Sequence, residues 1–254
     1  MEYIAERGAD MKYKLSLCYD GSRYRGWQRQ KSTDNTVQGK LEDTLSRILS
    51  QPIDAAGCGR TDAGVHAKLQ VCSFTADTDM PCADILEALR KYLPEDIGAI
   101  SLEQADGRFH ARLSCKEKTY IYRIWNSSEP NVFGRKYVYS YPKKLDIAKM
   151  RSAAELLMGT HDFSPFSSGK KSKKSTVRTI YGIEIDKCDD LITIAVTGNG
   201  FLYNMVRIIV GTLIEAGDGR RSAGSVADIF ESGKRETAGF TAPAEGLFLW
   251  DIKY

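Results

Sequence analysis

A chain of 254 residues, with 42% hydrophobic and 27% charged side chains, has the composition of a folded globular protein and is long enough for one large domain or two smaller ones. Its formal net charge of +3 says little about partners, because a nucleic-acid binder needs positive charge on one face rather than in the total. The most apolar helical stretch, residues 205–214, contains Arg207 and is far shorter than the roughly 20 residues of a membrane span. The sequence therefore predicts no membrane span.

The cysteines and the first ten residues bear on the compartment. The cysteines are scattered, with no C-x-x-C pair, at Cys18, Cys58, Cys72, Cys82, Cys115 and Cys188. This spacing favours free thiols in a reducing compartment over a disulfide framework. Residues 1–10 are too polar to form the apolar core of a secretory signal. We therefore expect a cytoplasmic protein.

The first half of the chain predicts the order β-α-β-β-α-β. From Lys12 to Tyr19 apolar and polar residues alternate, as in a strand with one buried face, and the strand ends at a turn signal. Thr36 is a suitable N-cap for a helix whose apolar positions recur at helical spacing until Pro52. After an irregular segment, a strand, a helix and a strand are predicted near residues 69–75, 83–93 and 97–102.

The second half repeats this pattern. Strands are predicted near residues 120–125 and 136–140, a helix at 146–158, a hairpin at 180–185 and 191–196, a helix at 202–216 and a last strand at 247–253. The rough duplication indicates an α+β protein built from two split β-α-β units, each an antiparallel or mixed sheet with helices on one face.

The densest cluster of reactive residue types lies in the irregular segment 57–67, where three glycines surround Arg60, Asp62 and His66. Glycines let the backbone approach a substrate closely, and Arg60 and Asp62 share one side of an extended chain. An ion pair between them would keep the carboxylate deprotonated even when desolvated. Taken in isolation, Asp62-Ala63-Gly64 is more simply a turn in which the aspartate bonds its own backbone.

The run Gly59–His66 resembles the signature of the TruA type of tRNA pseudouridine synthases. Similar motifs occur over nearly the whole chain, at residues 24–30, 36–38, 109–112, 118–122, 199–207 and 242–247. The resemblance implies a pseudouridine synthase fold, in which two ferredoxin-like or RRM-like units with mostly antiparallel sheets form a central cleft. We place the N-terminal domain, with the aspartate loop, at residues 11–112, and the C-terminal domain, which completes the active site, at residues 113–254.

The resemblance also assigns the reactive residues. It makes Asp62 the catalytic aspartate, with Arg60 beside it, Tyr120 the active-site tyrosine and Arg207 the arginine that pairs with the aspartate. Taken alone, Tyr120 would be an ordinary sheet tyrosine. Arg207 interrupts a very apolar stretch, where an unpaired guanidinium would be costly to bury, so a carboxylate partner is expected. The order of chemical steps at Asp62, as nucleophile or as base, stays open.

Basic residues interleaved with aromatic rings predict contacts with structured RNA. The candidates for substrate binding, besides Tyr120, are Arg25, Arg29, Arg112, Lys171 and Lys174. Each segment alone would favour a plain solvated surface. A target uridine in a stem must also be unstacked and flipped, at a cost of a few kcal/mol, to reach a buried carboxylate.

The resemblance implies isomerisation of uridine at positions 38, 39 and 40 of the tRNA anticodon stem-loop by a homodimer. The histidines His66, His110 and His161 show no metal-ligand spacing, so we expect neither a metal nor a cofactor. Two alternatives remain. One is a pseudouridine synthase for another structured RNA, and the other is a non-catalytic RNA-binding protein on the same fold, which would have no need of a buried carboxylate that repels phosphate.

Overall fold

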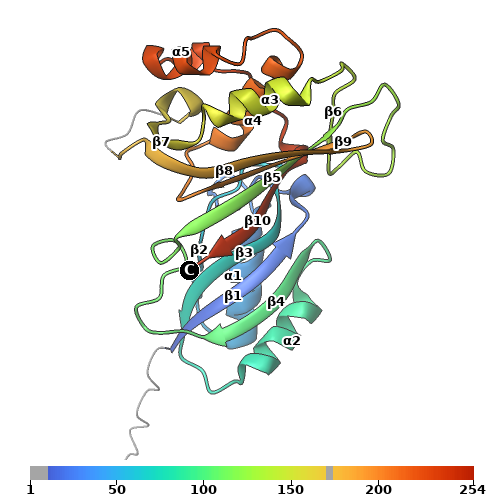
Figure 1. Cartoon of the computed structure of the whole chain (residues 1–254). Coiled ribbons are helices and arrows are strands. Elements are labelled where there is room, and N and C mark those ends of the chain that lie inside the picture. The colour runs from blue at the N-terminus through green and yellow to red at the C-terminus, as the bar shows by residue number, and fades with distance from the viewer. Residues whose placement is uncertain (1–10, 170–173) are drawn as a thin grey trace, which may run out of the picture. The chain divides into compact units, whose positions relative to one another are not determined.

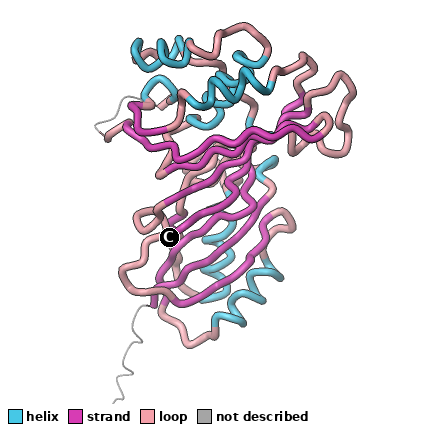
Figure 2. Tube along the Cα trace, viewed as in Figure 1, coloured by secondary structure: helices cyan, strands magenta, loops and turns pink. Residues whose placement is uncertain are grey.

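The computed structural model describes residues 11–169 and 174–254, which form two compact units (Figure 1). Unit 1 ends at Cys115 and includes Tyr254, and unit 2 comprises Lys116–Lys253. Both units combine helices with strands (Figure 2). The predicted α+β class is confirmed.

Unit 1 has the β-α-β-β-α-β order that the sequence predicts, and its second strand is the short β2 (Ala56–Gly57), for which no residue range was predicted. Its elements are β1 (Met11–Tyr19), the 3-10 turn η1 (Gly21–Arg23), α1 (Val37–Leu49), β2 (Ala56–Gly57), β3 (His66–Ala76), α2 (Cys82–Tyr92) and β4 (Ile97–Gln104). The strands lie in the order β4-β1-β3-β2, and every pair in it is antiparallel. This is the strand order of the split β-α-β motif, so the predicted ferredoxin-like unit is confirmed.

Local sequence explains the first strand and helix of unit 1. Along β1, Tyr13, Leu15 and Leu17 are fully buried, and the residues between them are partly exposed. The Thr36 side chain accepts a hydrogen bond from the Gly39 N–H, as an N-cap does, and α1 follows with its apolar stripe buried. Helices α1 and α2 pack against each other, and α2 packs on β4.

Unit 2 repeats this order and adds to it. Its elements are β5 (Glu117–Trp125), β6 (Tyr139–Ser140), α3 (Ile147–Glu155), β7 (Gly159–Asp162), η2 (Ser164–Phe166), β8 (Val177–Cys188), β9 (Leu191–Gly198), α4 (Met205–Gly217), α5 (Ser225–Ser232), η3 (Arg235–Thr237), η4 (Ala244–Gly246) and β10 (Leu247–Lys253). The strands β10-β5-β9-β8 reproduce the order of unit 1, with β7 added beside β8 and β6 parallel to β5. The predicted duplication is therefore confirmed.

Several elements of unit 2 differ from the prediction. The helix predicted to reach Met158 ends at Glu155, and the segment after it pairs with β8 as β7. Helix α5 was not predicted, although Val226 and Ile229 are spaced as buried residues of a helix. Short elements such as β7 depend on partners far along the chain, which local periodicity does not reveal.

Two compositional expectations can be compared with the structure. In the described residues no helix is long and apolar enough to cross a membrane. All six cysteines are described, and none forms a disulfide. Residues 1–10, which are too polar for a secretory signal, lie outside the described residues.

Removing the cap of α1 should weaken unit 1. Thr36→Ala removes the hydroxyl that satisfies a backbone N–H at the buried start of the helix. We expect the free energy of unfolding, measured by urea denaturation, to fall by about 1–2 kcal/mol. Thr36→Ser keeps the capping oxygen and is the matched control, with a smaller expected loss. An equal loss in both variants would assign the effect to the missing methyl group and contradict the capping role.

Candidate active site

Asp62 lies at the start of a tight turn in the loop between β2 and β3. The Val65 N–H donates to the Asp62 carbonyl at 3.1 Å, and Gly64 has the positive φ, +80°, that the third position of such a turn favours. The turn that the local sequence predicts is therefore present. It leaves the Asp62 residue half-buried, two positions after the exposed Arg60. A rigid turn is also what a reactive carboxylate needs in order to meet a substrate in one geometry.

A second loop, residues 24–27, lies directly against this turn. The Trp27 N–H donates to the Thr61 carbonyl at 3.0 Å, and the Gly64 N–H donates to the Tyr24 carbonyl at 3.3 Å. Gly26 has a φ of +96°, and a Cβ there would come within 2.6 Å of the Thr61 carbonyl oxygen. Only glycine permits both this backbone conformation and this contact. Residues 24–27 thus support the Asp62 turn.

Further close contacts hold the ends of the Asp62 loop. A Cβ on Gly57 would lie 2.6 Å from the indole of Trp27, and a Cβ on Gly21 would lie 1.9 Å from the Val65 carbonyl oxygen. His66 is buried, and its Nδ1 accepts a hydrogen bond from the Gly21 N–H at 3.1 Å. His66 therefore has a structural role in anchoring the loop. Among the described residues, no group of three or more His, Cys, Asp and Glu could hold a metal ion.

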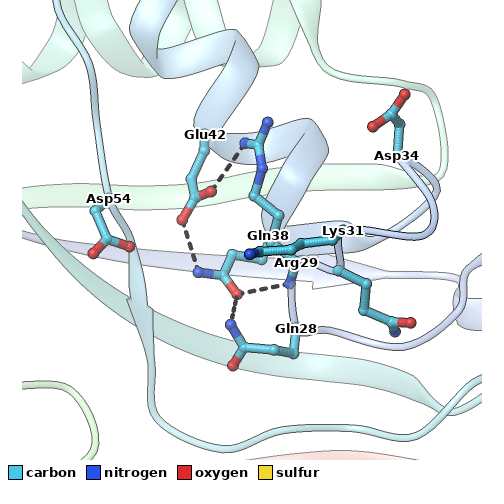
Figure 3. A pocket seen from close by; sticks show the side chains of 8 residues that line it. Gln28, Arg29, Lys31, Asp34, Gln38, Glu42 and Asp54 are labelled. Carbon is cyan, nitrogen blue, oxygen red and sulfur yellow. Dashed lines mark hydrogen bonds and ion pairs between the residues drawn. The ribbon is translucent and has the colours of Figure 1, made fainter.

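A buried polar network connects the loop that follows Trp27 to α1 (Figure 3). Gln38 Oε1 accepts from Gln28 Nε2 at 2.7 Å and from the Arg29 backbone N–H at 3.0 Å. Gln38 Nε2 donates to Glu42 Oε1 at 2.7 Å and to the Ala55 carbonyl at 3.0 Å. Glu42, in turn, accepts from the Ala55 N–H at 3.0 Å. The network ties α1 to the chain on both sides of it.

The same region holds a polar cavity of about 490 Å³ in unit 1 (Figure 3). Its lining residues are Gln28, Arg29, Gln30, Lys31, Asp34, Gln38, Glu42 and Asp54. The Arg29 guanidinium lies 3.1 Å from Glu42 Oε2 and 2.9 Å from Asp43 Oδ1. Two carboxylates thus offset the charge of Arg29. These contacts give it a role in holding the loop, and its contact with RNA stays a prediction.

The other basic candidates are exposed, as Arg29 is. Arg25 lies in the loop against the Asp62 turn, and Arg112 follows β4 in the last part of unit 1. Lys174 is also exposed, in unit 2. Lys171 lies outside the described residues. A contact with phosphate requires an exposed side chain, and the described candidates meet that requirement. Their role in RNA binding stays a prediction.

In unit 2, Tyr120 lies on the central strand β5 between β10 and β9. It is paired with Leu249 on one side and Val196 on the other, and only 6% of its surface is exposed. The Phe201 ring packs edge-on against it, with ring centroids 5.1 Å apart. A ring held by a central strand and an aromatic neighbour has little freedom to move.

Arg207 lies in the first turn of α4, and its guanidinium is held by its own unit. Its Nε donates to the Ala242 carbonyl at 2.7 Å, and its Nη1 donates to Asn204 Oδ1 at 3.1 Å. The Ala242 N–H donates back to the Arg207 carbonyl at 3.0 Å, and the next residue, Pro243, accepts from the Tyr122 hydroxyl at 2.7 Å. Residues 242–243 therefore link α4 with β5, the strand that carries Tyr120.

The sequence did not reveal the two residues of α1 that support the loop after Trp27. Gln38 and Glu42 are buried polar residues four positions apart on α1, beside the buried Leu41 and Leu45. Polar residues at buried helical positions are a recognisable signal, because such groups are retained only with hydrogen-bond partners. Their partners lie in loops, which periodicity does not place.

Comparison with known proteins assigns the family. A family model described as tRNA pseudouridine synthase matches residues 17–113 and 153–254. A protein named tRNA pseudouridine synthase A 2 from Bacillus cereus is 45% identical over 242 residues, which is 95% of this chain and 99% of the relative. The chain belongs to the tRNA pseudouridine synthase family. The matched residues of the family model include Asp62, Arg60 and Arg207 but not Tyr120.

Other relatives support the same family assignment. Proteins named tRNA pseudouridine synthase A from Bacillus sp. (strain KSM-64) and Acetivibrio thermocellus are 46% and 44% identical, each covering 95% of this chain and 99% and 98% of the relative. A crystal structure of a Cbf5-Nop10-Gar1 complex aligns with a TM-score of 0.38 at 13% identity, over 80% of this chain and 45% of that chain. That structural likeness is too weak to carry an argument.

The contact between Gly26 and the Asp62 turn can be tested in this family member. Gly26→Ala places a methyl group 2.6 Å from the Thr61 carbonyl oxygen at a φ of +96°. We expect a loss of about 1–3 kcal/mol in the free energy of unfolding, measured by thermal denaturation. Gly107→Ala is the matched control, because no atom lies within 4 Å of its added Cβ, and it should change stability by less than about 0.5 kcal/mol. A neutral Gly26→Ala variant would contradict the tight contact.

Proposed function

We propose that this chain converts uridine to pseudouridine at positions 38, 39 and 40 of the tRNA anticodon stem-loop, with the carboxylate of Asp62 as its essential group. Two observations support the proposal. The chain belongs to the tRNA pseudouridine synthase family, and Asp62 lies in a turn held on both sides by close backbone contacts. The turn is the observation that supports the assignment of Asp62, because a reactive side chain must be held in one geometry.

The reaction is an isomerisation, so the product contains the same atoms as the substrate. The bond between the ribose carbon and the uracil nitrogen breaks, the base turns, and a bond forms between the same ribose carbon and a ring carbon. That ring carbon loses its proton, and the nitrogen gains one. An ionised carboxylate can trap or stabilise positive charge at the sugar, as in glycoside hydrolysis, or act first as a base on the ribose or attack the ring. Each route needs Asp62 ionised.

We assign supporting roles to three other residues. Arg207 pairs with the Asp62 carboxylate and keeps it ionised, and Arg60, two positions before Asp62, adds positive charge nearby. Tyr120 stacks on the uracil ring or serves as the base that removes the ring proton. The fixed guanidinium of Arg207 and the fixed ring of Tyr120 support these roles. Neither a metal nor a cofactor is needed for any of these steps.

Basic side chains would hold the tRNA while the target nucleotide is flipped. Our candidates for phosphate contacts are Arg25, Arg29, Arg112, Lys171 and Lys174. Contacts on the flanks of the target can offset the few kcal/mol that flipping costs. We also propose that the protein acts in the cytoplasm as a homodimer, as the resemblance implies. Light scattering of the purified protein would check the dimer.

The central prediction concerns the carboxylate. Asp62→Asn keeps the shape of the side chain but removes its charge, so we expect no isomerisation of tRNA uridine and a tRNA affinity within a small factor of wild type. Mass spectrometry of digested tRNA and a filter-binding assay measure the two quantities. Asp79→Asn, at an exposed aspartate of unit 1, is the control and should keep full activity. Substantial turnover by Asp62→Asn would end the essential role of this carboxylate.

The choice of RNA is tested with transcripts. We expect turnover of tRNA whose uridines lie at positions 38, 39 or 40, and no turnover when these uridines are replaced by cytidine. Ribosomal and small nuclear RNA transcripts are the competing substrates. Turnover of one of these but not of tRNA would favour another RNA target, and binding of tRNA without turnover would favour a non-catalytic RNA-binding protein.

Arg25 and Arg29 should differ in their effect on tRNA binding. Arg25 is exposed, so Arg25→Ala should weaken binding and reduce the slope of log affinity against log salt by about 1. Arg29 is paired with Glu42 and Asp43, so Arg29→Ala should change the slope less. Filter binding across a salt series measures both. Equal slopes for wild type and Arg25→Ala would exclude a phosphate contact at Arg25.

A further inference from the structure

A buried hydrogen-bond network lies behind the Asp62 loop. The Tyr19 hydroxyl and Thr61 Oγ1 are 2.8 Å apart, and Gln70 Nε2 donates to the Gly59 carbonyl at 2.8 Å. Tyr19, Thr61 and Gln70 are all buried, at 5%, 6% and 0% exposure. Polar side chains at this depth carry a desolvation cost, which hydrogen bonds such as these offset.

Tyr19 and Gln70 are brought together by an irregularity in the sheet. Tyr19 is the last residue of β1, and Gln70 lies on β3, where its partner is Leu17. Between the pairs Leu17–Gln70 and Tyr19–Ala67 the register shifts, so that β3 has one extra residue. Such bulges re-aim side chains and are common beside active sites. Here the irregularity lies directly behind the loop that carries Asp62.

The surroundings of the Tyr19 hydroxyl fix its protonation state. Burial raises the pKa of the Tyr19 hydroxyl, and the hydrogen bonds of Thr61 and Gln70 act in the opposite direction. The hydroxyl therefore stays protonated at neutral pH and acts within the network as a neutral hydrogen-bonding group. Both side chains that contact it also hold the loop, Thr61 as part of it and Gln70 through the Gly59 carbonyl.

Gln70 carries an additional cost that argues for a purpose. Its Oε1 atom is buried and has no hydrogen-bond partner among the described residues. An unsatisfied buried acceptor destabilises the folded state, and an apolar side chain of similar size would avoid that cost. What the amide supplies in return is the bond to the Gly59 carbonyl, three residues before Asp62.

We propose that Tyr19, Thr61 and Gln70 are positioning residues for the isomerisation. Their hydrogen bonds hold residues 59–61 so that the Asp62 carboxylate keeps one orientation. This inference rests on the proposed function of Asp62. The network fixes the Gly59 carbonyl and the Thr61 side chain, while the Trp27 N–H fixes the Thr61 carbonyl. With all three bonds made, the backbone before Asp62 cannot shift without breaking one of them. A misplacement of about 1 Å at a reacting group can cost on the order of 100-fold in rate.

The test is Tyr19→Phe, with Tyr13→Phe as its matched control. Tyr13 lies on the same strand with its side chain on the same buried face, and its hydroxyl has no hydrogen-bond partner among the described residues. Both variants remove one buried hydroxyl and keep the ring. We expect Tyr19→Phe to lower kcat by about 10- to 100-fold with an unchanged KM for tRNA, and Tyr13→Phe to keep both values.

Hydrogen–deuterium exchange supplies a readout that does not depend on activity. Backbone amides of residues 59–65 should exchange faster in Tyr19→Phe than in wild type, and at the wild-type rate in Tyr13→Phe. An unchanged kcat or an unchanged exchange rate in Tyr19→Phe would overturn the proposal, as would equal losses in both variants. If wild type itself left tRNA uridine unchanged, the proposed function would fail, whereas the exchange measurement would still report on the network.

A double-mutant cycle tests whether the partners act as one unit. Thr61→Val removes the hydroxyl and keeps the shape of the side chain. If the bond between Tyr19 and Thr61 carries the effect, the double variant should lose little more kcat than either single variant, because the second change removes a bond already lost. Fully additive losses would mean that the two side chains act independently and would overturn the network.

Discussion

The approach of two backbone segments, residues 24–27 and 59–64, is the contact on which the candidate site depends. Gly26 makes it possible, since any side chain there would collide with the Thr61 carbonyl and would have to adopt a positive φ. Hydrogen bonds between the segments then turn a flexible glycine-rich loop into a defined one. The glycines around Asp62 therefore produce rigidity through close packing, although each is flexible in an unfolded chain.

Two polar networks support that contact from different sides. Gln38 and Glu42 hold the loop after Trp27, and Tyr19 and Gln70 hold the loop before Asp62. A hydrophobic core would give stability with fewer desolvation costs, but it has no directional preference. Hydrogen bonds specify orientation, and orientation is what a catalytic carboxylate requires. The use of buried polar groups at this place is consistent with a site whose geometry matters more than its stability.

In unit 2, hydrogen bonds orient the side chain of an arginine. The guanidinium of Arg207 is bonded to the Ala242 carbonyl and to Asn204, and residues 242–243 are also bonded to Tyr122. The helix that carries Arg207 and the strand that carries Tyr120 are thus joined by one short segment. An arginine with two of its donors engaged in this way presents the rest of its guanidinium in a fixed direction.

By itself the sequence determined the α+β class, the repeat of two split β-α-β units, the cap of α1 at Thr36, and the identity of Asp62 as the candidate carboxylate. These follow from periodicity, capping and a local motif, which are properties of neighbouring residues. Only the tertiary structure decided that Gly26 touches Thr61, that Arg29 is paired with two carboxylates, and that Tyr19 and Gln70 support the Asp62 loop. Each of these contacts joins residues far apart in the chain, and a one-residue change of sheet register, such as that between β1 and β3, leaves no periodic signal that a single sequence can reveal.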